Sequence, residues 1–261
     1  MPDPGPGTGA GPASTWRIEH LAQVGSTNDE ARARARDGDP GQLLIVAAEQ
    51  LSGRGRRGRQ WHSPPGNLYC SALLRPDMAP AQGGLYSFVA AVALADAIAE
   101  CAPMAAPHLT CKWPNDLRIA GAKVSGILLE SGARADGGID HLIIGTGVNV
   151  RFTPPGADER YPATCLADHG QPDLATATTA YLRHLAAWCA RFAEQGFAPV
   201  RQAWLARAEG LGQEIVVRLG QEELHGRFLA FAADGALCLG LRDGSTRTIV
   251  SGEIVQTVPV V

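Results

Sequence analysis

The sequence predicts an α+β protein, in which a mixed or antiparallel sheet is flanked by helices and followed by a small C-terminal β-barrel-like module. Three observations support this class. The chain has 261 residues, enough for one large domain with a small satellite. Segments with helical apolar spacing are interleaved with clusters of short strand-like runs. From residue 212 onward, short strands follow one another between Asp-Gly turns.

The chain divides into three expected segments. Residues 1–15 are almost all Pro, Gly, Ala, Ser, Thr and Asp, and we expect them to be a disordered tail. Residues 16–211 are expected to form the main domain, and residues 212–261 the small β module. The tail lacks the basic start and apolar stretch of a signal peptide. The longest apolar run, at residues 88–98, is interrupted by Asp96 and too short to cross a bilayer, so we expect a cytoplasmic protein without a membrane segment.

The first part of the main domain begins with a loosely alternating strand at residues 16–24. A helix is expected next, because a hydroxyl at Ser26 or Thr27 can cap its free amides and the following acids suit the positive end of its dipole. It ends near the Gly-Asp-Pro at residues 38–40. The next elements are predicted as buried strands at residues 43–48 and 68–74, and an Ala-rich helix at residues 85–100.

The remaining elements are short strands and two further helices. In the main domain, strands are predicted at residues 109–113, 117–119, 123–130 and 141–150, and helices at residues 173–194 and 199–208. In the β module, strands are predicted at residues 214–219, 222–231, 236–241 and 246–250.

The composition excludes some function classes. With 23 basic and 26 acidic residues the net charge is −3, so no overall basic excess draws the chain to nucleic acid and any anion site must be local. The six cysteines are scattered, without the Cys/His spacing of a zinc site, and are expected to be reduced thiols.

The most informative segment is the Gly-Arg-Gly-Arg-Arg-Gly-Arg run at residues 53–59. It contains G-x-G-x-x-G, but the paired prolines at residues 64–65 prevent the helix that a dinucleotide fingerprint requires. It also lacks the Gly-Lys-Ser/Thr of a P-loop. Four arginines on a glycine backbone still indicate anion recognition. We expect this loop to be mobile when empty and to order over an anionic ligand, the alternative being a solvated basic loop or a nucleic-acid patch.

A second group of polar residues surrounds a proline-forced turn at residues 112–116, Lys-Trp-Pro-Asn-Asp. Asp116 could bind Mg²⁺, which prefers one or two carboxylates together with substrate phosphates. Lys112 would add positive charge. Lys123 opens an otherwise apolar strand, which is costly unless its side chain faces a site.

Several of these motifs together resemble those of the biotin protein ligases. They are Gly-Ser-Thr-Asn at residues 25–28, Glu-Gln at 49–50, the Gly-Arg loop, Lys-Trp-Pro-Asn-Asp, Lys123, Gly-Ile-Leu at 126–128 and Gly-Thr-Gly-Val-Asn at 145–149. The order and spacing match over residues 16–170, and the β-rich tail is similar more weakly. The resemblance implies a class II synthetase-like catalytic domain at residues 16–211 and an SH3-like barrel at its C-terminus.

The resemblance also implies a role for each matching residue. The catalytic residues would be Lys123, Arg54 and Arg56. The residues around biotin would be Ser26, Thr27, Asn28, Gln50, Gly53, Arg54, Gly55, Arg56, Lys123 and Gly126. The residues around ATP would be Arg56, Arg57, Arg59, Trp61, Lys112, Asn115, Asp116, Lys123 and Asn149, with Asp116 holding Mg²⁺. Trp61 could equally be a core tryptophan.

The implied reaction joins biotin to ATP as biotinyl-5′-AMP and then transfers biotin to a lysine of a biotin carboxyl carrier protein. Because the first predicted strand starts near residue 16, we expect no helix-turn-helix, no DNA binding and no repressor role. The chain is expected to be a monomer or a homodimer. The alternatives are a lipoate or octanoate ligase or transferase of the same fold, and a nucleic-acid-binding module that uses the arginine-rich loop.

Overall fold

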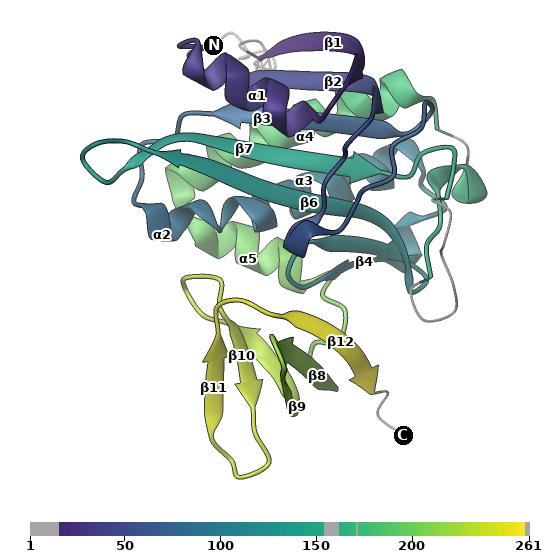
Figure 1. The fold of residues 1–261 in the computed structure, drawn as a ribbon. Helices are drawn as coiled ribbons and strands as arrows, with labels where there is room; N and C mark the ends of the chain where they lie inside the picture. The colour runs from purple at the N-terminus through teal and green to yellow at the C-terminus, as the bar shows by residue number, and fades with distance from the viewer. Residues whose placement is uncertain (1–15, 154–161, 171, 259–261) are drawn as a thin grey trace, which may run out of the picture.

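The computed structural model describes residues 16–153, 162–170 and 172–258, and the predicted tail at residues 1–15 lies outside this range. A seven-stranded mixed sheet forms the larger part, in the order β1-β2-β3-β7-β6-β5-β4 (Figure 1). Its strands are β1 (Arg17–Val24), β2 (Leu43–Gln50), β3 (Leu68–Leu74), β4 (Leu109–Lys112), β5 (Asp116–Ile119), β6 (Ala122–Ala133) and β7 (Ile139–Val148). Only β1 and β2 pair in parallel within this sheet; the other neighbours are antiparallel.

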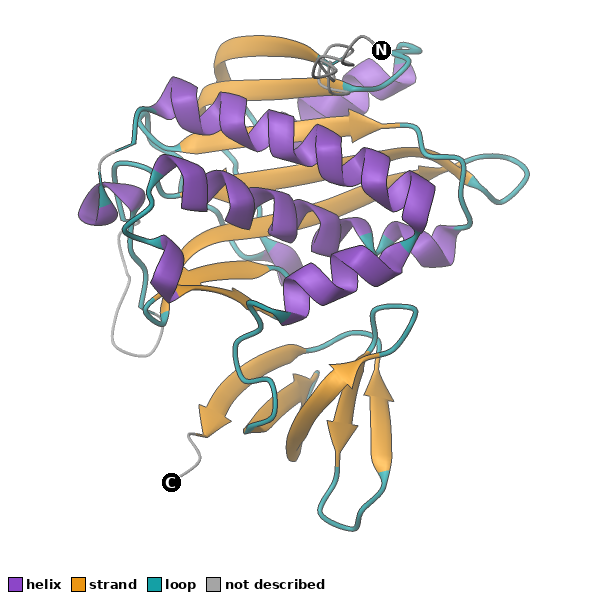
Figure 2. Cartoon of the chain, turned by 180° about the vertical axis from the view of Figure 1, so that it is seen from behind, coloured by secondary structure: helices purple, strands orange, loops and turns teal. Residues whose placement is uncertain are grey.

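Both faces of this sheet are buried near its centre, because alternate side chains of a strand point to opposite faces. Leu44 of β2 belongs to the large core cluster under the helices α3 (Tyr86–Cys101) and α4 (Leu174–Gln195). Its neighbours Leu43 and Ile45 instead pack with Ala31 of α1 (Thr27–Arg36). Figure 2 shows α3, α4 and α5 (Phe197–Leu205) covering one face. The other face therefore remains available for α1 and for the segment that follows β2.

The C-terminal part is a five-stranded antiparallel sheet in the order β11-β10-β9-β8-β12. Its strands are β8 (Glu214–Leu219), β9 (Glu222–Phe231), β10 (Leu237–Gly240), β11 (Thr246–Ile249) and β12 (Glu253–Val258). Phe231 at the end of β9 packs its ring against Phe88 of α3 and Trp204 of α5, with centroids 5.0 and 4.9 Å apart. This aromatic cluster fixes the small sheet beneath the helices (Figure 1).

The structure confirms the predicted α+β class with its small C-terminal β fold, and most elements lie where the sequence places them. Three details differ. The short helix α2 (Pro80–Gly83) and the strand β12 were not predicted. The hydroxyl cap expected at the start of α1 is wrong, because Ser26 makes no side-chain cap bond. The amide of Thr27 is instead bonded by the Gln50 Oε1 atom at 2.9 Å.

Among the described residues, one helical segment, Pro80–Cys101, is long and apolar enough by composition to cross a membrane. Most of that segment is buried inside the fold, where α3 contributes to the large core cluster.

Phe231→Ala should lower the free energy of unfolding by about 3–5 kcal/mol, because it opens a cavity at a fully buried ring that joins the two sheets. Leu229→Ala, two residues earlier on the same strand and 46% exposed, should cost less than about 1 kcal/mol. Urea titrations of both variants and the wild type measure the difference. Equal losses in the two variants would contradict the role of the aromatic cluster.

Candidate active site

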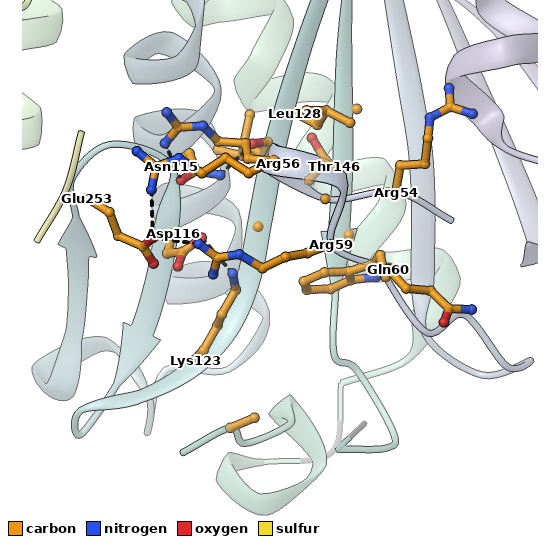
Figure 3. Close-up of a pocket in the computed structure, with 18 of the residues that line it drawn as sticks. Arg54, Arg56, Arg59, Gln60, Asn115, Asp116, Lys123, Leu128, Thr146 and Glu253 are labelled. Atoms are coloured by element: carbon orange, nitrogen blue, oxygen red, sulfur yellow. Dashed lines mark hydrogen bonds and ion pairs between the residues drawn. The ribbon is translucent and has the colours of Figure 1, made fainter. Parts of the chain in front are cut away.

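A cavity of about 840 Å³ lies on the sheet face opposite α3. It is enclosed by the start of α1, the Gly-Arg loop, β5, β6, β7 and the edge of the C-terminal sheet (Figure 3). Its size is within the range of about 300–1,000 Å³ that is common for small-molecule sites. The predicted site residues that line it are Ser26, Thr27, Asn28, Gln50, Arg54, Gly55, Arg56, Arg57, Arg59, Trp61, Lys112, Asn115, Asp116, Lys123 and Gly126.

Residues 53–61 form a hairpin over this cavity, and we call this segment the flap. Its arms are joined by the Trp61 amide, which donates to the Gly53 carbonyl at 2.9 Å, and by a bridge between Arg54 and Gln60. A Cβ atom on Gly53 would lie 2.4 Å from the Trp61 oxygen, so only glycine allows this approach. The tip is a single 3-10 turn at residues 56–58. The flap thus lies in the connection between β2 and β3, two neighbouring strands of the main sheet.

The floor of the cavity includes three glycines of β6 and β7, beside Leu128 and Thr146. A Cβ atom on Gly147 would lie 2.4 Å from the Trp61 indole, and one on Gly145 would lie 2.3 Å from the Asn28 side chain. Gly126 is the third, with Trp61 and Lys123 atoms at 3.2 and 3.3 Å from its virtual Cβ. The indole therefore lies directly on the sheet as part of the cavity wall. Trp61 is a site residue rather than a core tryptophan.

One end of the cavity is polar and uncharged. The Thr27 hydroxyl donates to the Gln50 Oε1 atom at 3.1 Å, and the Ser71 hydroxyl lies 2.7 Å from the Thr27 oxygen and 2.6 Å from the Asn28 Oδ1 atom. Asn28 is 3% exposed, and its Nδ2 atom has no hydrogen-bond partner. A buried amide donor without a partner is costly, so this end is arranged for a ligand that carries a hydrogen-bond acceptor.

The other end is built around Lys123, whose Nζ atom lies 2.7 Å from the Asp116 Oδ1 atom. A register shift between β5 and β6 pairs Lys123 with Arg118 and Gly126 with Asp116. The bulge therefore puts Lys123 on the same face as Asp116, where an unbroken ladder would put it on the opposite face. The ammonium group also lies 5.5 Å from the centre of the Trp61 ring, at cation–π distance.

Arg56 and Arg59 of the flap point toward this charged end (Figure 3), and Arg57 also lines the cavity. Arg56 donates a hydrogen bond to the Asn115 Oδ1 atom at 3.2 Å. The Asn115 Nδ2 atom in turn donates a hydrogen bond to the Ile127 carbonyl at 2.8 Å, which holds this side chain in place. Burial, and next the nearby Arg57, lower the pKa of Arg56. An anionic ligand next to this buried guanidinium would stabilise its charged form.

Glu253 of β12 lines the cavity from the C-terminal sheet. Its carboxylate lies 2.5 Å from Arg59 and 3.5 Å from Arg57. Burial by itself would raise the pKa of Glu253, but the Arg59 hydrogen bond and the nearby cations outweigh it and hold the pKa below its ordinary value. The charged carboxylate joins the flap to the small sheet.

Positive charge predominates in the cavity although the chain as a whole is acidic. Six arginines and two lysines line it, against the carboxylates of Asp116 and Glu253. The sequence contains only two lysines, Lys112 and Lys123, and both line this cavity. Burial, and next the nearby Arg118, lower the pKa of Lys112. The positive charge that an anion site needs is therefore concentrated locally in this cavity.

Three predicted residues are placed differently from the rest. Arg54 lines the cavity, but its guanidinium points away from Lys123 and bonds Asp29 (Figure 3). Asn149 is buried behind the cavity, where its amide donates to the Thr164 carbonyl at 3.0 Å. Gly53 does not line the cavity and serves the hairpin of the flap.

Sequence reasoning missed several residues of the site, namely Ser71, Arg118, Gly145, Gly147, Arg218 and Glu253. The Gly-Thr-Gly at residues 145–147 carried a usable signal, because alternate glycines in a strand indicate a close approach from one side. Glu253 carried none, since it lies in a strand that was not predicted.

Comparison with known proteins agrees with this geometry. Residues 23–149 match the biotin/lipoate A/B protein ligase family, and residues 210–255 match the biotin protein ligase C terminal domain. The chain is 42% identical over 225 residues to the biotin–[acetyl-CoA-carboxylase] ligase of Paracoccus denitrificans, covering 84% of this chain and 92% of that protein. The chain belongs to the biotin protein ligase family.

Solved structures of biotin protein ligases have the same fold. The Aquifex aeolicus enzyme in complex with biotin and ATP superimposes with a TM-score of 0.76 at 28% identity, over 91% of this chain and 97% of that one. The Leishmania major enzyme in complex with biotinyl-5-AMP gives a TM-score of 0.64 at 25% identity, over 90% and 99%. The C-terminal family match includes Glu253, so the carboxylate that reaches the flap belongs to a typical part of a biotin protein ligase.

Gly147→Ala should displace the Trp61 indole and unseat the flap, because the added methyl group would overlap the ring. Trypsin should then cleave the ligand-free protein at the flap arginines at least about fivefold faster, the effect of an overpacking penalty of about 1 kcal/mol. Gly84→Ala is the matched control, since a Cβ atom there meets nothing. Equal cleavage rates in the two variants would show that the indole does not hold the flap.

Proposed function

We propose that this chain activates biotin with ATP to form biotinyl-5′-AMP and then transfers biotin to a lysine of a biotin carboxyl carrier protein. One observation carries the proposal. A single cavity joins a neutral hydrogen-bonding end, with the unpartnered amide of Asn28, to a cationic end around Lys123. Biotin has a neutral ureido ring at one end and a carboxylate at the other, which matches this division.

At the neutral end, Asn28 would donate to the ureido carbonyl, and Ser26, Thr27 and Gln50 would surround the ring. Asn28 and Thr27 are each 3% exposed and are already positioned by Ser71. A site that hydrogen-bonds a polar group discriminates strongly against analogues that lack it. Lipoate and octanoate carry no ureido group, so this end favours biotin over both.

At the cationic end, Lys112, Asn115, Arg57 and Arg59 would serve ATP, whose phosphates need the positive charge that the cavity concentrates. Asp116 is the protein carboxylate that fits Mg²⁺, because this ion is commonly held by one or two carboxylates and substrate phosphates. Within residues 16–153, 162–170 and 172–258, no group of three His, Cys, Asp or Glu side chains is placed to hold a metal. When bound, Mg²⁺ would neutralise charge on the departing pyrophosphate.

In the first step, a carboxylate oxygen of biotin bonds to the α-phosphorus of ATP, and the bond from that phosphorus to the bridging oxygen breaks, releasing pyrophosphate. Lys123 would hold the attacking carboxylate and the α-phosphate together and stabilise the charge that develops between them. Its ion pair with Asp116 and its contact with the Trp61 ring fix the ammonium group before the ligands arrive.

In the second step, the amine of the carrier lysine bonds to the acyl carbon, and the bond from that carbon to the phosphate oxygen breaks. AMP leaves with the electron pair, and the amine proton is lost to solvent. Until then the mixed anhydride must be kept from water, and the flap lies over the part of the cavity where it would form. Arg56 would bond the adenylate phosphate from the flap.

The substrate ATP and the thiols support a cytoplasmic location for this chain, which we include in the proposal. ATP and a reducing environment are both found in the cytoplasm, and all six cysteines are free thiols in the structure. The partner is the carrier protein or the carrier domain of a biotin-dependent carboxylase.

Lys123→Ala should reduce biotin-dependent exchange of pyrophosphate into ATP by at least about 100-fold, because it removes the charge next to the reacting carboxylate. The wild type should exchange with biotin and not with lipoate or octanoate. Arg183→Ala, at an exposed position on α4, serves as the control and should match the wild type. Wild-type exchange in Lys123→Ala would end the role assigned to this lysine, and exchange with lipoate alone would replace the proposed substrate.

Arg56→Ala should increase the release of free biotinyl-adenylate about tenfold, since a charge-assisted bond from the flap to the phosphate is lost. The release can be followed as labelled adenylate that passes a desalting column or spin filter. Release at the wild-type rate would show that Arg56 does not hold the intermediate.

A further inference from the structure

Four charged side chains form a closed ring at the rim of the cavity, between α1, β6 and the first arm of the flap; of the four, Arg54 also lines the cavity. Arg54 donates two parallel hydrogen bonds to the Asp29 carboxylate, each 2.7 Å long. Arg32 donates to Asp29 at 2.7 Å and to Glu130 at 2.6 Å. The Arg54 Nη2 atom lies 3.7 Å from the Glu130 carboxylate and closes the ring. Arg54 has been assigned to the site only because it matches the family motif. The proposed chemistry gives no role to Asp29, Arg32 or Glu130.

Arg54 cannot bond this ring and the reacting groups in the same conformation. Figure 3 shows its side chain extending away from Arg56, Asp116 and Lys123, which face one another across the charged end. Its two-pronged contact with Asp29 uses both terminal nitrogens of the guanidinium. The carboxylates that hold it come from a helix and a strand of the main sheet, both rigid relative to a hairpin.

The position of Arg54 within the flap gives this contact its effect. Arg54 is bridged to Gln60 on the opposite arm, and the next residue, Gly55, bonds the Arg59 carbonyl at 2.6 Å. Fixing Arg54 therefore fixes both arms where the hairpin narrows to its tip. Arg56, two residues further, then meets Asn115.

We infer that Arg54 is a positioning residue, and that its ring with Asp29, Glu130 and Arg32 latches the flap in the closed position over the reaction intermediate. This inference rests on the proposed function and deepens it, since the latch determines how long the acyl-adenylate is retained before the carrier arrives. The Arg54 hydrogen bond, the largest of several effects, holds the pKa of Asp29 below its ordinary value, so the latch is charged at neutral pH.

The latch is reversible because its members are partly exposed. The side chains of Arg54 and Asp29 are 37% and 42% exposed, and those of Arg32 and Glu130 are 32% and 25% exposed. Ion pairs at such positions are weak and are screened by salt. A flap held in this way opens readily, as the entry of biotin and of the carrier lysine requires.

Hydrogen exchange of the flap amides in the ligand-free protein tests the latch directly. Arg54→Ala and Asp29→Asn should each speed exchange about three- to tenfold, and the double variant should be no faster than the faster single variant. Raising the salt concentration should speed exchange in the wild type but not in Arg54→Ala. Glu19→Gln, which breaks the separate Arg34 pair of α1, is the matched control and should leave the flap unchanged. Additive single effects, or unchanged exchange in Asp29→Asn, would overturn the latch.

Activity measurements separate positioning from direct catalysis. With saturating biotin and ATP, Asp29→Asn should keep pyrophosphate exchange within about twofold of the wild type. Asp29→Asn and Arg54→Ala should both release biotinyl-adenylate about three- to tenfold faster. Exchange reduced about 100-fold in Arg54→Ala but not in Asp29→Asn would make Arg54 a catalytic residue and overturn the inference. If the wild type itself shows no biotin-dependent exchange, the proposed function fails, while the ligand-free experiment still decides whether the latch exists.

Discussion

The absence of side chains at three positions on one face of two central strands is the constraint on which the rest of the site depends. Gly126, Gly145 and Gly147 leave the backbone of β6 and β7 bare, so Trp61 and Asn28 can lie on it where a Cβ atom would exclude them. Trp61 then places its ring next to the Lys123 ammonium group, and Asn28 directs its free amide into the cavity. The flap, the hydrogen-bonding end and the charged end thus share one backbone surface. Glycine normally weakens a strand, and this cost is accepted where other groups must approach closely.

The cations of the site fall into two groups, those that have a carboxylate partner and those that have none. Carboxylates partner those cations whose position must be fixed in advance: Asp116 with Lys123, Glu253 with Arg59, and Asp29 with Arg54. Among the residues that the structure describes, no ion pair joins Arg56 or Lys112 to a carboxylate, and burial lowers the pKa of both. Cations that lie close together without carboxylate partners repel one another and destabilise the empty cavity. A ligand that carries phosphates relieves this repulsion. Binding energy is therefore concentrated where ATP reacts with biotin.

Much of the fold could be predicted from sequence because its elements are locally encoded. The strands at Leu68–Leu74 and Glu214–Leu219 have the predicted bounds, since apolar runs between turn residues define both. β12 was missed because it pairs with β8, more than thirty residues earlier, and carries little pattern of its own. Glu253 was not predicted as a site residue because it lies in this strand. The motif set placed Arg54 and Arg56 equally at the chemistry. In the structure Arg54 lies on the paired arm of the hairpin and Arg56 in the turn at its tip, and a glycine-arginine run does not encode where the arm ends and the turn begins. The bulge that turns Lys123 toward Asp116 is likewise a property of the paired strands.

The site combines two kinds of interaction with different responses to solvent. Its floor and neutral end are held by backbone pairing and buried hydrogen bonds, which salt hardly affects. Its flap is held at the sides by partly exposed ion pairs, to Asp29 on α1 and to Glu253 on the C-terminal sheet. Because the aromatic cluster around Phe231 packs the small sheet against α3 and α5, the strand that carries Glu253 belongs to the same packed core as the main sheet. The hairpin can therefore open and close between fixed supports without disturbing the surface that recognises biotin. An enzyme that must admit two small substrates, protect an anhydride and then admit a protein lysine requires this division between a rigid floor and a weakly held cover.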